Sequence, residues 1–157
     1  MINCIRTASN NQDFQNLVKE LDKDLSIRDG EEHSFYAQFN KIDLIKHAIV
    51  AYENETPIAC GAIKEYSPDI MEVKRMYVSE NKRGQGFAST ILKELENWAA
   101  ELNYKKCILE TGKKQPEAIA LYQKSNYLII SNYSQYKNVE NSVCFEKILP
   151  TERKSGN

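Results

Sequence analysis

An arginine followed by two glycines is the feature of this chain whose residue types and spacing most directly indicate chemistry. These residues stand in the segment 83–88 (RGQGFA), after a strand-like run and a short polar loop. The segment also opens a helix, whose first N–H groups lack intrahelical partners and lie at the positive end of the helix dipole. Glycine lets a backbone approach an anion closely, and the arginine adds a fork of charged donors. The segment therefore predicts a phosphate or pyrophosphate site, although a glycine turn with a solubilising arginine explains the same residues.

The helix that begins inside this segment is predicted by the spacing of its apolar residues. They recur at steps of three and four, which places them on one face of a helix. These residues are Phe87, Ala88, Ile91, Leu92, Leu95, Trp98, Ala99 and Leu102. The preceding run, 71–78, reads as a strand. Together the strand, the loop and the helix would hold the N–H groups of the segment in place.

This strand–loop–helix unit resembles the acyl-CoA-binding motif of the GNAT superfamily of N-acyltransferases. The matching pattern is Arg83-x-x-Gly86-x-Ala88, and the similarity extends over roughly residues 49–127, including LETG at 109–112 and AIALYQK at 118–124. The resemblance implies acetyl-CoA as the cofactor. Its pantetheine arm would pair with the strand backbone, and its pyrophosphate would meet the loop N–H groups. The cofactor contacts so predicted are Met76, Tyr77, Val78, Arg83, Gly84, Gln85, Gly86, Phe87, Ala88, Ser89, Gln115, Ala118 and Tyr122.

The implied reaction moves an acyl group from a thioester to an amine, which must first lose a proton. Glu72 is our first choice for the base, because on an uninterrupted strand it shares the face of Met76, four residues further on. Some family members carry a glutamate at the matching position. Glu110, at the end of the next strand, is the second choice, and a water relay is the third. The alternative role for Glu72 is a solvent-facing residue of the strand.

Tyr122 is the predicted acid. In the family, a tyrosine on the short helix after the fifth strand points at the thioester sulfur, and Ala118-x-x-x-Tyr122 matches that pattern. The alternative is that Tyr122 simply packs on the apolar face of its helix. The chain departs from the family where Asn126-Tyr127 replaces the common Gly-Phe. Asparagine tolerates positive φ, so the backbone conformation could survive the change.

Contacts with the acceptor are predicted in two segments. The region after the first helix usually shapes the acceptor pocket in this family, although its aromatic residues could simply pack on the core. Its candidates are His33, Tyr36, Gln38 and Asn40. The run 132–144 resembles a bacterial subgroup whose acceptor we cannot name. Its candidates are Tyr133, Tyr136 and Asn141.

Periodicity and turn residues predict the remaining elements. Strands are expected at 2–6, 48–53, 57–65, 70–78, 106–110, 127–130 and 142–148, with a three-residue hairpin connection at 54–56. Helices are expected at 12–25, from Gln85, at 116–125, and as one or two short pieces in 31–46. The resemblance implies an α/β (α+β) fold with a GNAT-like mixed sheet. This sheet is mostly antiparallel, with about six or seven strands, about four flanking helices, and parallel fourth and fifth strands splayed around the cofactor.

Composition narrows the class of protein. The chain has 157 residues and a net charge of −1, which argues against a general nucleic-acid binder. No apolar run approaches the ~20 residues that span a bilayer, and the N-terminus lacks signal-peptide features, so we expect a cytoplasmic protein that does not act at a membrane. We expect one domain, 1–150, and a polar tail, 151–157. The cysteines show no metal-ligand spacing, so we predict no metal site and four buried free thiols: Cys4, Cys60, Cys107 and Cys144.

The leading hypothesis is an acetyl-CoA-dependent N-acetyltransferase that acts on a primary amine of a small or amino-acid-like molecule. An acetyltransferase for a protein or an aminoacyl-tRNA keeps the same fold, and the near-neutral charge counts mildly against the tRNA. A non-catalytic acyl-CoA-binding sensor is the alternative from another class. The sequence does not determine the acceptor, the acyl-chain length or the oligomeric state, and it leaves a homodimer open.

Overall fold

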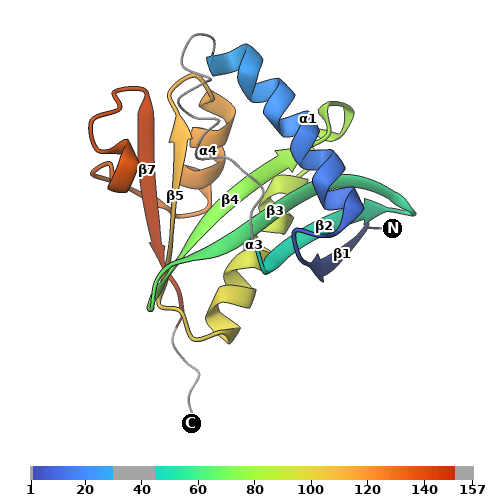
Figure 1. Ribbon diagram of the computed structural model, residues 1–157, viewed down its shortest axis with the longest axis horizontal. Coiled ribbons are helices and arrows are strands. Elements are labelled where there is room, and N and C mark those ends of the chain that lie inside the picture. The colour runs from blue at the N-terminus through green and yellow to red at the C-terminus, as the bar shows by residue number, and fades with distance from the viewer. Residues whose placement is uncertain (1, 30–44, 151–157) are drawn as a thin grey trace. The chain divides into compact units, whose positions relative to one another are not determined.

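The computed structural model describes residues 2–29 and 45–150, and Figure 1 shows their elements in chain order. These residues form two compact units. The first unit combines Met1–Lys64 with Lys74–Leu95, and the second combines Glu65–Val73 with Glu96–Asn157. The long strands β3 and β4 and the helix α3 each contribute residues to both units.

Seven strands form one sheet in the order β1-β2-β3-β4-β5-β7-β6. The strands are β1 Ile2–Thr7, β2 His47–Glu53, β3 Thr56–Ser67, β4 Ile70–Val78, β5 Lys106–Gly112, β6 Leu128–Ile130 and β7 Ser142–Ile148. The pairs β1–β2, β2–β3, β5–β7 and β6–β7 are antiparallel, whereas β4–β5 is parallel. The predicted mixed, mostly antiparallel sheet with parallel fourth and fifth strands is confirmed.

Three α-helices lie in the described residues: α1 Gln12–Asp29, α3 Phe87–Glu101 and α4 Pro116–Lys124. Asn11 caps α1, because its side-chain oxygen accepts a hydrogen bond of 2.8 Å from the N–H of Phe14. The helix ends at Asp29 rather than at the predicted Leu25. Its last turn buries no apolar residue, and so left no periodic signal in the sequence. The short helices predicted in 31–46 fall almost entirely outside the described residues.

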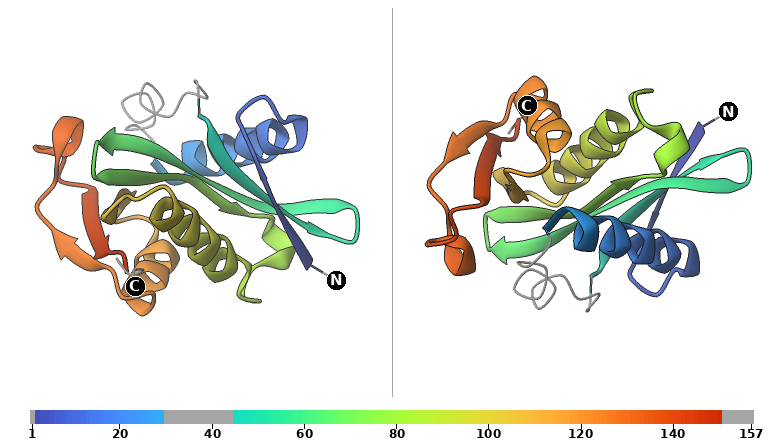
Figure 2. Two further views of the ribbon diagram at one scale, coloured as in Figure 1. Left: turned by 90° about the horizontal axis from the view of Figure 1, so that it is seen from below. Right: turned by 90° about the horizontal axis from the view of Figure 1, so that it is seen from above.

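In the first unit, α1 packs on the strands through the apolar face that its sequence predicts. Phe14, Leu17 and Val18 are buried against residues of β2 and β3. The opposite face of these strands receives α3, as Figure 2 shows. Gly61 permits this close approach, because a Cβ there would come within 2.7 Å of the Ile91 side chain.

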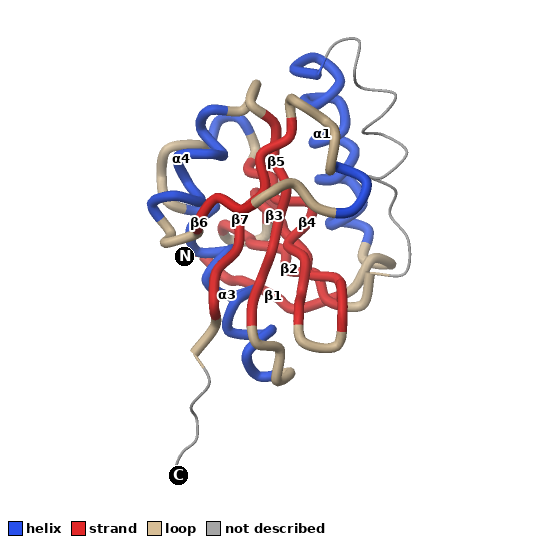
Figure 3. Tube along the Cα trace, turned by 90° about the vertical axis from the view of Figure 1, so that its left-hand side faces the viewer, coloured by secondary structure: helices blue, strands red, loops and turns tan. Residues whose placement is uncertain are grey.

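In the second unit, β5 pairs with β7 along its whole length, from Lys106↔Ile148 to Gly112↔Ser142. Figure 3 traces β5, β7 and the short edge strand β6. Helix α4 begins with a proline at its first turn, as predicted, and Asn126 beyond its end has φ 74. The asparagine therefore does adopt the left-handed conformation that the common glycine would take.

Two predicted boundaries are wrong for reasons of backbone geometry. Glu53 pairs with Thr56, so the β2–β3 turn has two residues instead of three, and Asn54 supplies its positive φ of 59. Helix α3 begins at Phe87 rather than Gln85, because Gly84 and Gly86 have φ 78 and 88, which no right-handed helix contains.

Strand β4 is interrupted at Arg75, which has φ 61 although it is not a glycine. The carbonyl oxygen of Arg75 accepts a hydrogen bond of 3.4 Å from the Cys60 thiol. A left-handed residue within a strand breaks the alternation of side chains. The argument that placed Glu72 on the face of Met76 assumed regular strand geometry, which Arg75 does not have, so that shared face stays a prediction. The proposal that Glu72 is the base therefore depends on the side chains that surround it.

All four cysteines are free thiols, as predicted. Cys60, Cys107 and Cys144 are buried, while Cys4 is only half-buried. Burial raises the pKa of the Cys60 thiol to about 12. Of the helices within residues 2–29 and 45–150, none combines the length and the apolar character that crossing a bilayer requires.

Candidate functional site

The loop before α3 holds a run of backbone N–H groups without backbone acceptors. The N–H of Arg83 reaches the carbonyl of Glu80 at 3.5 Å, and the next one to find a carbonyl is Thr90, on Gly86 at 3.1 Å. Within the described chain, none of the six N–H groups of residues 84–89 makes a short, well-aligned hydrogen bond to a backbone carbonyl. Residues 84–86 are exposed. The protein does not cap these donors with its own backbone, so the helix N-terminus can receive an anion.

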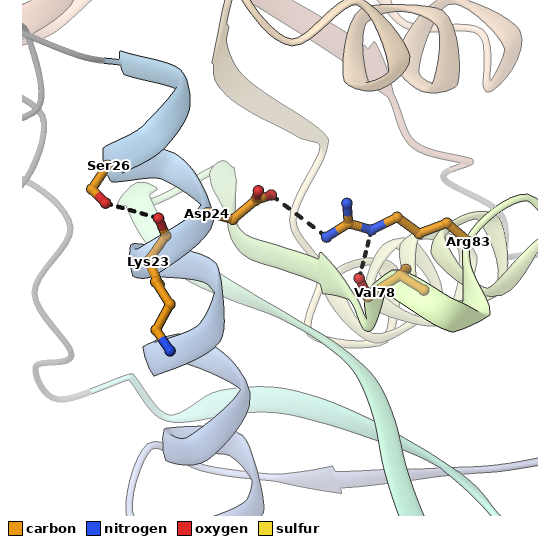
Figure 4. A network of polar contacts seen from close by, with 5 residues as sticks. All are labelled: Lys23, Asp24, Ser26, Val78 and Arg83. Carbon is orange, nitrogen blue, oxygen red and sulfur yellow. Dashed lines mark hydrogen bonds and ion pairs between the residues drawn. The ribbon is translucent and has the colours of Figure 1, made fainter.

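Arg83 is held beside this loop by three groups of the first unit. Figure 4 shows its Nε donating to the carbonyl of Val78 at 2.9 Å and its Nη2 lying 3.5 Å from the Asp24 carboxylate. Its guanidinium carbon is also 5.4 Å from the centre of the Tyr77 ring. These contacts tie the end of β4 to α1. The sequence did not indicate Asp24 as the partner. The predicted contact of Arg83 with phosphate stays a prediction.

The strand before the loop leaves its last residues outside the ladder with β5. The parallel ladder of β4 with β5 covers only Ile70, Met71 and Glu72. Residues 76–78 take no part in it, and they are half-buried. The end of this strand is anchored by the N–H of Ser79, which donates to the carbonyl of Ile58 at 2.8 Å. Pairing of residues 76–78 with a pantetheine arm remains a prediction.

In the second unit, Tyr133 connects a glutamate with two other tyrosines. Its hydroxyl donates to Oε2 of Glu72 at 2.7 Å. Its ring stands edge-on to Tyr66, with centroids 5.3 Å apart, and to Tyr136, at 5.8 Å. Such perpendicular pairs are a favoured geometry of aromatic rings. Tyr133 is therefore fixed at both ends, by its ring and by its hydroxyl.

The second candidate base, Glu110, lies in the same group of side chains. Its Oε2 accepts a hydrogen bond of 2.7 Å from Ser142. Glu110 faces Cys144 across the β5–β7 ladder, so Ser142 is its diagonal neighbour on the same face. Tyr136 is 3% exposed, and burial raises its pKa, with further contributions from Glu110 and Glu72. Both carboxylates thus contribute to keeping the Tyr136 phenol protonated.

Tyr122, the predicted acid, is buried on α4. Its ring centre is 5.8 Å from those of Tyr127 and Phe145. Burial raises the pKa of Tyr122, and the Glu110 carboxylate adds to this effect. The phenol therefore remains protonated at neutral pH, as a proton donor must. Tyr122 also packs against apolar neighbours, as the alternative interpretation proposed. This packing is compatible with a hydroxyl that donates a proton.

The remaining predicted site residues have few described contacts or lie outside the described residues. Gln115 precedes α4, and its carbonyl accepts from the N–H of Ala118 at 3.1 Å, while its side chain makes no capping bond. His33 and Tyr36, with Gln38 and Asn40, lie outside the described residues. Two members of the group around Glu72 escaped the sequence reasoning. They are Tyr66 and Ser142, whose neighbours are set by strand pairing rather than by a local motif.

Comparison with known proteins adds independent findings. The model of the acetyltransferase (GNAT) family matches residues 14–127. The IAA acetyltransferase of Azospirillum brasilense is 32% identical over 102 residues, which cover 64% of this chain and 67% of that protein.

Solved structures agree in fold. A candidate acyl-CoA N-acyltransferase from Klebsiella pneumoniae superposes with a TM-score of 0.79 at 26% identity, covering 95% of this chain and 98% of that one. A GNAT family acetyltransferase from Elizabethkingia anophelis, with acetyl-CoA bound, superposes with a TM-score of 0.68. Its identity is 18%, over 94% of this chain and 98% of that one, so this likeness concerns the fold.

Proposed function

Because the chain belongs to the acetyltransferase (GNAT) family, whose model matches residues 14–127, we propose that it transfers an acetyl group from acetyl-CoA to a primary amine of a small molecule. Membership of the family confirms the resemblance seen in the segment 83–88. The observation that carries the proposal is the run of N–H groups at residues 84–89, which lack backbone acceptors in the described chain.

These N–H groups would hold the diphosphate of acetyl-CoA. Hydrogen bonds to a charged acceptor contribute roughly 1.5–3 kcal/mol each, so two or three of them account for micromolar affinity only together with the rest of the cofactor. The helix dipole of α3 favours the same anion. In support, the structural relative from Elizabethkingia anophelis has acetyl-CoA bound.

The second unit holds the groups that acyl transfer needs. Glu72 takes the proton of the ammonium group, and the freed lone pair attacks the thioester carbonyl. The tetrahedral intermediate then expels the sulfur as the C–S bond breaks. Tyr122 gives its phenolic proton to the departing thiolate and is restored by the second proton, which the former amine nitrogen loses as the amide forms, while Glu72 releases its proton to solvent. Glu110, at the end of β5, is the second candidate base, and its carboxylate contributes to the raised pKa of Tyr122 and of Tyr136.

The test is to incubate the protein with acetyl-CoA and a panel of primary amines while the release of free thiol is followed. We expect thiol release that depends on one class of amine, together with an acetylated product found by mass spectrometry. Tight binding of CoA without amine-dependent release across the panel would overturn the proposal in favour of an acyl-CoA sensor. Release with a peptide or an aminoacyl-tRNA alone would replace the small molecule by that acceptor.

A further inference from the structure

Tyr133 was expected to contact the acceptor, but its surroundings assign it another task. Its hydroxyl donates to Oε2 of Glu72 at 2.7 Å. An O–H to carboxylate bond of this length is a charge-assisted hydrogen bond, about twice as strong as a neutral one. We propose that Tyr133 is a positioning residue, which holds the carboxylate of Glu72 in the orientation needed to accept the amine proton. This inference rests on the proposed function, in which Glu72 is the base.

The geometry of the rings supports this assignment. Tyr66 and Tyr136 both stand edge-on to Tyr133, with interplanar angles of 74° and 89°. They come from different elements, since Tyr66 lies next to the last residue of β3 and Tyr136 lies in the short helix η3, Ser134–Tyr136. Edge-on contacts with two other rings restrict how far the Tyr133 ring can turn its hydroxyl away. The hydrogen bond to Glu72 is therefore built into the fold of the second unit.

The protonation of the pair supports it as well. Burial and the nearby Glu72 raise the pKa of the Tyr133 phenol, so its hydroxyl stays protonated at neutral pH. The phenol then donates and the carboxylate accepts. Glu72 must accept the amine proton in one geometry, so a fixed hydrogen-bond donor such as the Tyr133 hydroxyl would help to keep its carboxylate in place. Misplacement of a catalytic group by about 1 Å can lower the rate about a hundredfold.

The chain supplies a matched control. Tyr104 also donates its hydroxyl to a glutamate, Glu65, within the second unit. This second pair belongs to the exposed surface and contains no residue with a proposed role in the reaction. Tyr133→Phe and Tyr104→Phe thus each remove one tyrosine–glutamate hydrogen bond and leave the ring in place.

The kinetic experiment compares these two variants with Glu72→Gln and with the double variant Glu72→Gln/Tyr133→Phe. We expect Tyr133→Phe to lower kcat at least about tenfold with the KM for acetyl-CoA unchanged, and Tyr104→Phe to change neither. If Tyr133 acts through Glu72, adding Tyr133→Phe to Glu72→Gln should cost nothing further. A raised KM for the amine with unchanged kcat would mean that Tyr133 touches the acceptor instead, and the inference would fall.

A structural readout keeps the inference separate from the proposed function. Crystal structures of the parent protein and of both tyrosine variants would show whether the Glu72 carboxylate changes position in Tyr133→Phe alone, as we expect. An unmoved carboxylate would overturn the inference even if the enzyme is active. Full activity of Glu72→Gln would instead show that Glu72 is not the base. The hydrogen bond from Tyr133 would then fix the Glu72 carboxylate without serving catalysis.

Discussion

Replacing Gly86 by alanine tests the anion site at its most sensitive point. Gly86 has φ 88, a conformation that an L-residue with a Cβ adopts at a cost of about 1–2 kcal/mol. An added Cβ would meet no atom within 4 Å, so the cost comes from the backbone and not from a clash. The loop either bears this strain or relaxes to another φ. Relaxation would change the directions of the N–H groups next to Gly86.

We therefore expect Gly86→Ala to lose about 1–2 kcal/mol of unfolding free energy, or to keep its stability and bind CoA about ten- to a hundredfold more weakly. The loss of affinity corresponds to one charge-assisted hydrogen bond or slightly more. Calorimetric titration with CoA measures the affinity, and urea denaturation measures the stability. Pantetheine lacks the diphosphate, so its binding should be the same in both proteins.

Asn103→Ala is the control, because it places an alanine at φ 71 at the opposite end of α3. It should cost comparable stability and leave CoA binding intact. Two results would refute the reasoning. One is a Gly86→Ala protein that is as stable as the parent and also binds CoA like the parent. The other is an equal loss of affinity for CoA and for pantetheine, which would place the damage elsewhere than the diphosphate.

Three further predictions concern other groups. Tyr122→Phe keeps the buried ring and removes the proton, so we expect kcat to fall by about a hundredfold with unchanged CoA affinity by calorimetry, and unchanged turnover would exclude the acid role. Asp24→Asn removes a carboxylate 3.5 Å from Arg83, so CoA should bind about two- to fivefold more tightly in a titration at low salt, with a stability change below about 1 kcal/mol because the pair is exposed. Burial and the hydrogen bond to Asp13 raise the pKa of Tyr52 to about 12, above its usual value of 10. Because the unfolded chain releases this proton first, stability should fall as pH rises from about 10 to 12 in denaturation experiments, and less steeply in Tyr52→Phe.

The sequence was informative wherever one short segment determines the structure. Apolar spacing located α1, α3 and α4, and the asparagine at 126 was recognised as a left-handed helix end. The glycines of the segment 83–88 indicated a turn with positive φ before the helix N-terminus, because such a turn is a local property, while the anion site proposed there stays a prediction. Each of these features depends on residues within a few positions of one another, so each leaves a readable pattern.

The features that escaped prediction depend on pairing between distant parts of the chain. The bulge at Arg75 occurs at a residue that does not favour positive φ, so composition gave no sign of it. Tyr133 and Glu72 are separated by 61 positions, and their hydrogen bond arises because strand order brings β4 and the segment before β7 together within the second unit.

This difference separates the two kinds of prediction made from the sequence. The predicted diphosphate contacts would use backbone N–H groups, whose positions follow from φ and helix register, so a motif of six residues is enough to propose them. The proton transfers use side chains, whose roles depend on which groups surround them. Glu72 illustrates this, since its first argument failed with the bulge at Arg75, whereas its hydrogen bond to Tyr133 gives a new and independent reason to expect a fixed carboxylate.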